Sequence, residues 1–230
     1  MDEDHDYTIR RQLNLHIPAG ILSHKGLSLN EKYVLGLDYA LSSKLGSNKY
    51  LNKQISQMLQ LHVNIISYTR KSLVQKGFLE KNGRHYRLSE KAQKIRVENY
   101  KYVLLPYQVY HHNKLCTGAK LLWGVYNSIS KGYNEYFAKR TTTASNLGVS
   151  VESVSKWTAQ LHSSGFLNEY RHNTGYSTNQ TIVVTRSFVN GASDSKSKTV
   201  DSYTKSGLNF LSVNLQEVEK ENLRFQIDIL

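Results

Sequence analysis

The sequence contains one short phrase twice, "KGFLEK" at residues 76–81 and "SGFLNE" at residues 164–169. Each copy follows a segment in which apolar residues recur at the spacing of an amphipathic helix. Glycine often ends a helix, because it adopts the left-handed backbone conformation without a steric penalty. The two apolar residues after the glycine are suited to hold the first strand of a β-hairpin against a core. We therefore expect Gly77 and Gly165 to mark the same junction in two related units.

The similarity between the two units extends over most of their length. Shifted by 88 residues, residues 18–79 align with residues 106–167 without a gap, and 13 of the 62 positions are identical. About four identities would be expected from average residue usage. The sequence therefore predicts an internal repeat with a shared backbone. The identities include Pro18/Pro106, His24/His112, Lys32/Lys120, Gly36/Gly124, Leu59/Leu147 and Phe78/Phe166.

Within each unit the pattern predicts three helices followed by a hairpin. The Asn-Gly pair at 82–83 is the strongest short signal for a hairpin turn, because both turn residues must accept a positive φ. The expected helices cover residues 27–41, 52–61 and 62–77 in the first unit and residues 115–129, 141–150 and 150–165 in the second. The expected hairpins cover residues 78–89 and 166–185.

Three helices and a β-hairpin, or wing, make a winged helix-turn-helix. The predicted fold is therefore mainly α with small β-hairpins, arranged as two tandem winged helix-turn-helix domains. The expected divisions are an acidic N-terminal tail at 1–16, a first domain at 17–88, a connecting helix at 89–103, a second domain at 104–186, a linker at 187–206 and a C-terminal docking segment at 207–230. The docking segment could contact its own protein, a second copy in a homodimer, or another partner.

The charge of the chain points to a polyanionic partner. Lys and Arg outnumber Asp and Glu by 30 to 18, and residues 17–213 hold 26 bases and 10 acids. Nucleic acid is the commonest partner of such a surface, although an acidic protein or an anionic membrane would also fit. Cys116 is the only cysteine, and the sequence has no secretory signal and no apolar run long enough to span a membrane. We expect a soluble, cytoplasmic protein that does not bind membranes.

The third helix of a helix-turn-helix enters the major groove of DNA, and its outward side chains contact base edges. With the apolar residues of this helix facing the core, the outward residues in the first unit are Asn64, Ser67, Tyr68 and Lys71. Asn forms a bidentate pair with adenine, and Lys reaches guanine or phosphate. These residues form the predicted DNA-reading surface of the first unit.

The equivalent surface of the second unit has Glu152, Ser155 and Lys156. A glutamate beside phosphates is unfavourable unless it accepts a hydrogen bond from a cytosine amino group, so Glu152 either contributes specificity or marks a unit that does not bind DNA. We expect the first. Hydroxyl and backbone N–H groups at the start of a helix commonly hold phosphate, which adds Arg140, Thr141 and Thr142.

The hairpins carry further basic residues, which are placed to contact phosphates or the minor groove. Such contacts add affinity and salt dependence but little sequence information. Each of these residues could instead be a solvated charge in a turn. They are Arg84, His85 and Arg87 on the first hairpin and Arg171 and His172 on the second.

No enzyme signature was found. A Walker lysine motif, HExxH, Gly-x-Ser-x-Gly and paired acids at metal-binding spacing are all missing from the sequence. The stretch "YHHN" at 110–113 invites comparison with the metal-binding histidines of nicking replication enzymes, but those alternate about an apolar residue. Here His111 and His112 are adjacent, and His112 matches His24, which favours a structural or surface role. We expect no catalytic residues, no metal site and no cofactor.

The second unit, "LCTGAKLLWGVYNSI" at 115–129 followed by "TTTASNLGVSVESVSKWTAQLHSSGFLNEY" at 141–170, resembles the winged-helix modules of replication proteins from plasmids, phages and their satellites. With the first copy, the resemblance covers about residues 18–185. It is a resemblance to tandem winged-helix replication initiators, and it implies binding to repeats in an origin and recruitment of helicase and primase factors.

The first hypothesis is therefore a non-catalytic replication initiator that binds double-stranded DNA at origin repeats, with both recognition helices on one face about 10 base pairs apart. The alternative is a transcriptional repressor of the same architecture, bound to operator repeats. A third hypothesis is an adaptor whose winged helices bind proteins.

Overall fold

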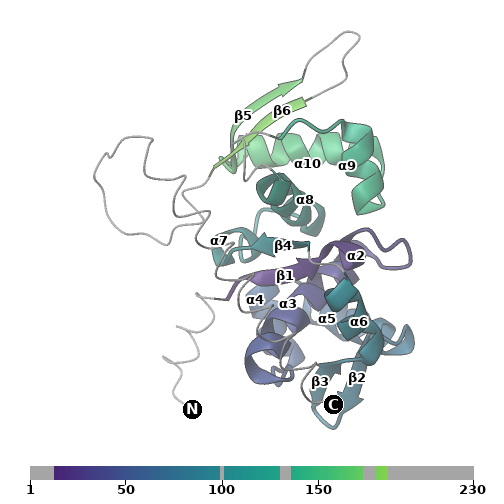
Figure 1. The fold of residues 1–230 in the computed structure, drawn as a ribbon. Coiled ribbons are helices and arrows are strands. Elements are labelled where there is room, and N and C mark those ends of the chain that lie inside the picture. The colour runs from purple at the N-terminus through teal and green to yellow at the C-terminus, as the bar shows by residue number, and fades with distance from the viewer. Residues whose placement is uncertain (1–12, 99–100, 130–135, 173–179, 186–230) are drawn as a thin grey trace, which may run out of the picture. The chain divides into compact units, whose positions relative to one another are not determined.

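A computed structural model describes residues 13–98, 101–129, 136–172 and 180–185 of the chain (Figure 1). The predicted linker at 187–206, the docking segment at 207–230 and most of the predicted acidic tail lie outside these residues. The first unit comprises β1 (Leu15–Pro18), α2 (Ala19–Leu22), α3 (Leu29–Leu45), α4 (Asn52–Leu59), α5 (Val63–Gln75), β2 (Leu79–Asn82) and β3 (His85–Leu88).

The second unit repeats this order after α6 (Glu90–Glu98). It comprises β4 (Tyr102–Leu105), α7 (Tyr107–Tyr110), α8 (Thr117–Ile129), α9 (Arg140–Leu147), α10 (Val151–Ser163), β5 (Leu167–His172) and β6 (Gln180–Val184). The bounds of α7, α9 and α10 are those of α2, α4 and α5 shifted by 88 residues. These equal bounds confirm the predicted repeat. The described part of the chain consists of helices and small antiparallel sheets.

The strands β1 and β4 were not predicted. The sequence led us to expect an acidic tail up to residue 16 and a connecting helix that continues to residue 103, but α6 ends at Glu98 and residues 102–105 form a strand. Both strands are four residues long and largely apolar, and such short runs do not show whether they form strands or helices. Their strand conformation depends on pairing with each other across about 87 residues of sequence.

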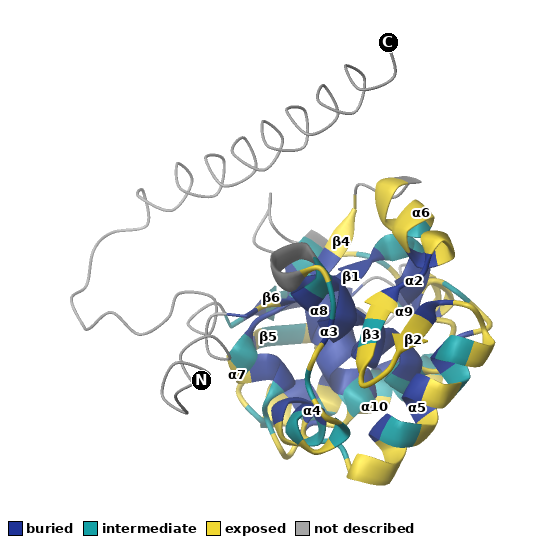
Figure 2. Cartoon of the chain, turned by 90° about the horizontal axis from the view of Figure 1, so that it is seen from below, coloured by how far each residue is buried: buried dark blue, intermediate teal, exposed yellow. Residues whose placement is uncertain are grey.

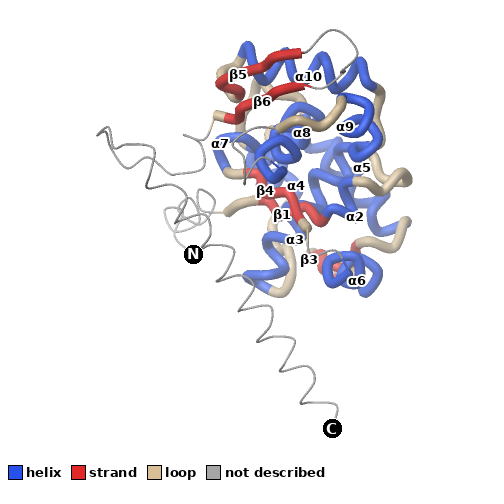
Figure 3. Tube along the Cα trace, turned by 45° about the horizontal axis from the view of Figure 1, so that its top comes forward, coloured by secondary structure: helices blue, strands red, loops and turns tan. Residues whose placement is uncertain are grey.

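The strands β1 and β4 lie side by side between the helices of the two units (Figures 1 and 3). Their register relates the units by a pseudo-two-fold axis. The strands are antiparallel, with Leu15 opposite Leu105 and Ile17 opposite Val103. His16 lies opposite Leu104, and these two residues occupy equivalent positions in the repeat. Leu15 faces the counterpart of Ile17, and Ile17 faces the counterpart of Leu15, which is the arrangement that two identical subunits adopt across a two-fold axis.

The repeated glycines Gly36 and Gly124 allow each first helix to lie against its strand. A Cβ atom on Gly36 would lie 2.6 Å from Ile17 Cγ1, and one on Gly124 would lie 2.3 Å from Val103 Cγ1. Carbon atoms do not approach this closely, so any side chain would push α3 from β1 or α8 from β4. The identity of these two positions in the sequence therefore reflects the same helix–strand contact in both units.

The repeated lysines form a reciprocal contact between the units. Lys32 Nζ on α3 donates a hydrogen bond to the Leu147 carbonyl at the end of α9 (2.9 Å), and Lys120 Nζ on α8 donates to the Leu59 carbonyl at the end of α4 (3.3 Å). Both lysines are buried, with 2% and 1% of their surface exposed. The last carbonyls of a helix lack partners within the helix and carry partial negative charge, so each ammonium satisfies one of them.

The polar contact between the first and third helices differs between the units. In the first unit, Arg70 Nη2 lies 4.0 Å from Asp38 Oδ1, with both side chains 1% exposed. Burial raises the pKa of Asp38 to about 6, although Arg70 and Asn48 act in the opposite direction. At the equivalent positions of the second unit, the Tyr126 and Thr158 hydroxyls share a hydrogen bond of 2.8 Å. A buried ion pair in one unit is thus a neutral hydrogen bond in the other.

The repeated histidines pack on the phenylalanines of the repeated Gly-Phe-Leu. The rings of His24 and Phe78 meet edge to face at 5.3 Å, and those of His112 and Phe166 do so at 5.0 Å. Burial and then nearby lysines lower the pKa of both histidines, which keeps the rings neutral at pH 7. The expected structural role of His112 agrees with this packing.

The buried ion pair predicts that substitutions at two equivalent positions of the repeat lower the free energy of unfolding by unequal amounts. Asp38→Ala leaves the Arg70 guanidinium buried without its counter-charge and should lower the free energy of unfolding by about 3–5 kcal/mol. Tyr126→Phe removes a neutral hydrogen bond, while Thr158 Oγ1 keeps its bond to the Val154 carbonyl, and should cost about 1 kcal/mol. Urea unfolding followed by circular dichroism measures both. Equal losses would contradict the assignment of a buried ion pair.

The buried lysine of the second unit predicts a dependence of stability on pH. Burial lowers the pKa of Lys120 to about 8 from 10.5, so between these values the unfolded chain binds a proton that the folded chain has lost. The free energy of unfolding should therefore rise with pH across this interval, by on the order of 3 kcal/mol. Below about pH 8 both states are protonated and this contribution is constant.

Lys120→Met should remove this contribution and leave only the rise that the lowered pKa of buried Lys32 gives, whereas Lys114→Met, which changes an exposed lysine on the same segment, should retain it. Urea unfolding at pH 7.5, 9 and 10 compares the wild type with both variants. A parallel pH profile for the wild type and Lys120→Met would show that the ammonium is not desolvated between the units.

Candidate nucleic-acid interface

The helix α5 is positioned by a tight turn after α4. Gln60 ends α4 in the left-handed conformation (φ 54°), and the His62 side chain accepts a hydrogen bond from the Asn64 N–H at the start of α5 (3.3 Å). Ile66 and Leu73 are fully buried, as the apolar spacing predicts. The first turn of α5 contains no acidic residue, so the positive end of the helix dipole is not neutralised by its own side chains.

The predicted DNA-reading residues of the first unit lie on the outward face of α5 (Figure 2). Asn64, Tyr68 and Lys71 are exposed, and Ser67 is half-buried. Tyr68 is 79% exposed, more than the other large apolar or aromatic side chains of the described residues that reach the surface. An aromatic ring held in this way on a helix has its full face available to a partner.

The segment that contains α5 is rich in positive charge. Residues 46–88 contain eight Lys or Arg and a single acid, Glu80. Arg70 is buried, Lys76 pairs with Glu31 (2.7 Å), and Arg87 pairs with Glu80 (2.7 Å). The other five are exposed and make no ion pair within the described part of the chain; they are Lys49, Lys53, Lys71, Lys81 and Arg84.

The predicted residues of the first hairpin differ in their availability. Arg84 lies in the turn between β2 and β3, His85 is the first residue of β3, and both are exposed. Arg87 is also exposed, but its Nε donates a hydrogen bond to Glu80 across the hairpin, so this ion pair must open or be shared before Arg87 binds a phosphate. Arg84 is therefore the better candidate for a phosphate contact.

Two apolar residues at the start of α5 belong to the same surface and were not predicted. Val63 and Ile65, on either side of Asn64, are 38% and 37% exposed. Helical spacing identifies Ile65 as outward, because it is rotated by about 100° from Ile66, but it places Val63, three residues before Ile66, close to the buried face. Apolar side chains at this end of a recognition helix contact the methyl group of thymine.

The second unit offers a different set of outward residues on α10. Glu152 and Lys156 are exposed, and Ser155 is half-buried. Hydrogen bonds from its own backbone N–H and from the Ser150 hydroxyl hold the pKa of Glu152 below its usual value, so the side chain is an anion at neutral pH. An ionised carboxylate in this position accepts hydrogen bonds and repels phosphate.

Arg140 is less accessible than the sequence suggests. Its side chain is half-buried, its guanidinium lies over the ring of Tyr170 at 5.6 Å, and Nε is buried without a hydrogen-bond partner in the described residues. The ring covers part of the guanidinium, and the phosphate contact of Arg140 stays a prediction. Thr141 and Thr142 beside it are exposed.

The second hairpin is only partly described. Arg171 is exposed but pairs through Nε with Glu169, two residues earlier on the same strand. His172 is the last residue of β5, and its side chain falls outside the described part. Residues 136–172 hold four Lys or Arg and two acids, so this unit is much less basic than residues 46–88.

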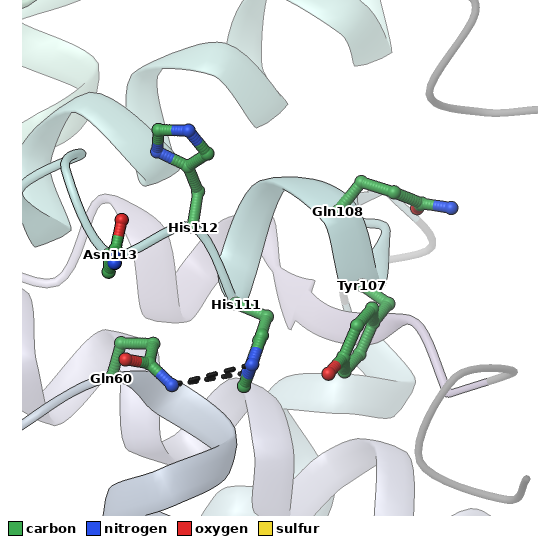
Figure 4. Close-up of a pocket in the computed structure, with 6 residues that line it drawn as sticks. All are labelled: Gln60, Tyr107, Gln108, His111, His112 and Asn113. Carbon is green, nitrogen blue, oxygen red and sulfur yellow. Dashed lines mark hydrogen bonds between the residues drawn. The ribbon is translucent and has the colours of Figure 1, made fainter.

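An open pocket of about 410 Å³ lies where the turn after α4 meets α7 (Figure 4). Its lining includes Gln60, Tyr107 and His111. The His111 ring stacks on Tyr107 at 4.6 Å, Gln60 Nε2 lies 3.4 Å from His111 Nε2, and His111 Nδ1 lies 3.1 Å from the Met58 carbonyl. These contacts join the two units. The pocket has no lysine or arginine in its lining, and it does not suit a polyanion.

Among the described residues there is no group of three His, Cys, Asp or Glu side chains that could hold a metal ion. The helices that the structure describes include none with the length and apolar character needed to cross a bilayer. Comparison of the chain with protein-family models, with curated proteins and with solved structures gives no match.

Proposed function

We propose that each unit is a winged helix-turn-helix and that the chain is a non-catalytic, sequence-specific double-stranded DNA-binding protein. The order of the elements supports the fold, because a short helix, a tight turn, a longer helix and a hairpin follow each other in both units. In each unit a residue before the second helix also bridges to the hairpin, Asn48 to Tyr86 and Tyr136 to Ile182. Such a bridge attaches a third short strand to a wing.

The observation that carries the function is the outward face of α5. It combines exposed Asn64, Tyr68 and Lys71 with a neighbouring hairpin that ends in exposed Arg84. Asn64 has the donor and acceptor that pair with adenine in the major groove, and Lys71 supplies a charge for guanine or phosphate. Arg84 on the wing is suited to phosphate or the minor groove. The charge of residues 46–88 gives such a face affinity for any duplex.

For the biological role we propose a replication initiator that binds origin repeats and recruits helicase or primase factors. Two DNA-reading units in one chain support this choice. The alternative is a transcriptional repressor with the same architecture, and a mini-replicon that carries the neighbouring DNA separates the two. An initiator supplied in trans supports replication of the mini-replicon, whereas a repressor only lowers expression from an adjacent promoter.

The proposed binding face predicts steep salt dependence and distinct effects of two substitutions. Affinity for duplex DNA, measured by fluorescence anisotropy, should fall by at least 10-fold between 50 and 200 mM salt, because several phosphate contacts release counterions. Lys71→Ala should weaken binding about 10-fold at the specific DNA site of the protein, because it removes a contact to guanine or phosphate. Arg84→Ala should weaken binding to all sequences alike and lower the salt slope by about one.

Lys101→Ala is the matched control, because Lys101 is exposed but lies between α6 and β4, outside α4, α5 and the first hairpin. It should bind like the wild type. Weak binding that hardly changes with salt would instead favour an adaptor whose helices bind proteins.

A further inference from the structure

The pseudo-two-fold relation between the units constrains the symmetry of a DNA target. We infer that a single chain binds an inverted repeat whose two halves differ in sequence, an inference that rests on the proposed DNA-binding function. Units repeated head to tail would place their recognition helices in the same direction along the DNA and would match a direct repeat. Units related by a two-fold axis place these helices in opposite directions along the DNA, and the matching target is an inverted repeat.

The two-fold relation has independent support at two places. The β1–β4 ladder pairs the equivalent residues His16 and Leu104 with each other. Lys32 and Lys120 make the same hydrogen bond in opposite directions, each to the end of the other unit's second helix. The helices α5 and α10 that follow these second helices have identical bounds within the repeat. The axis that relates the ladder and the lysine contacts therefore also relates the proposed recognition helices.

The two halves of the target should differ because the outward residues of α5 and α10 differ. Asn64 corresponds to Glu152 and Tyr68 to Lys156, and all four are exposed. With exposed Val63 and Ile65 beside it, Asn64 suits adenine and thymine. Ionised Glu152 suits the amino group of cytosine. One half-site should therefore be rich in A·T pairs, and the other should place a cytosine opposite α10.

The two half-sites should also contribute unequally to affinity. Residues 46–88 carry eight bases against one acid, whereas residues 136–172 carry four against two. Most of the phosphate attraction therefore belongs to the first unit, and the A·T-rich half should hold the chain when the other half is changed. The half opposite α10 should contribute mainly discrimination.

The test begins with selection of binding sequences from a library of random duplexes by the full chain. The selected consensus should contain two half-sites in inverted orientation. Synthetic duplexes then keep both half-sites and reverse one of them to give a direct repeat. Anisotropy titrations should show at least a 10-fold loss for the direct repeat, and sedimentation should show one chain per inverted duplex.

A grafted variant tests whether α10 contacts the second half. Glu152→Asn, Lys156→Tyr and Ala159→Lys give α10 the outward residues of α5, and all three positions are exposed, so the fold should be retained. Selection with this variant should give a palindrome made of two A·T-rich halves. Asn64→Ala is the control on the other helix, and it should relax preference only in the A·T-rich half, because it removes the donor and acceptor that pair with adenine.

The outcomes separate the inference from the proposed function. Absence of salt-dependent duplex binding would overturn both. Tight, salt-dependent binding to a direct repeat, to a lone half-site, or to a palindrome occupied by two chains would overturn the inverted-repeat inference and leave DNA binding in place. An unchanged consensus after grafting would show that α10 does not contact the bases.

Discussion

The antiparallel pairing of β1 with β4 is the contact on which the rest of the arrangement depends. It joins residues 15–18 to residues 102–105 and so places two complete helical units face to face. Each first helix lies on its own strand, and the glycines at 36 and 124 allow the close approach. The buried lysines then connect each unit to the far end of the other's second helix. An interface usually made between two chains is thus made within one.

The repeat preserves backbone geometry more closely than surface chemistry. The histidine on phenylalanine, the glycine at the end of the third helix and the lysine on the opposite carbonyl recur in both units. The polar contact in the core and the outward residues of the third helix do not. Several residues that hold the units together therefore recur, while one core contact and the outward residues of the third helix differ.

Much of the local structure could be predicted from the sequence, because the information is local. Gly77 and Phe78 recur with Gly165 and Phe166, and their spacing from the helical segments placed both third helices and both first hairpin strands. The exposure of Asn64, Tyr68 and Lys71 followed from helical periodicity in the same way. Ile65 was open to the same reasoning, whereas Val63, three residues before Ile66, has the spacing of the buried face although it is 38% exposed.

What the sequence did not predict depends on distant contacts. Lys32 and Lys120 were visible as an identical pair, but lysine is rarely fully buried, and only the position of the opposite helix end accounts for its burial here. Arg140 appeared free at a helix start, whereas the ring of Tyr170 lies against its guanidinium from the following hairpin. The strands β1 and β4 exist only as a pair, so neither short run indicates its conformation by itself.

The ladder also ties the completion of the first unit to the order of protein synthesis. The edge of β1 that pairs with β4 has its partner only after residue 105 has left the ribosome, when every other element of the first unit has already emerged. Until then a nascent chain exposes the backbone C=O groups of residues 15–18 and the N–H groups of residues 15–17. An unpaired strand edge is a template for pairing with another chain, so the nearest competing partner on a polysome is the equivalent strand of a neighbouring nascent chain.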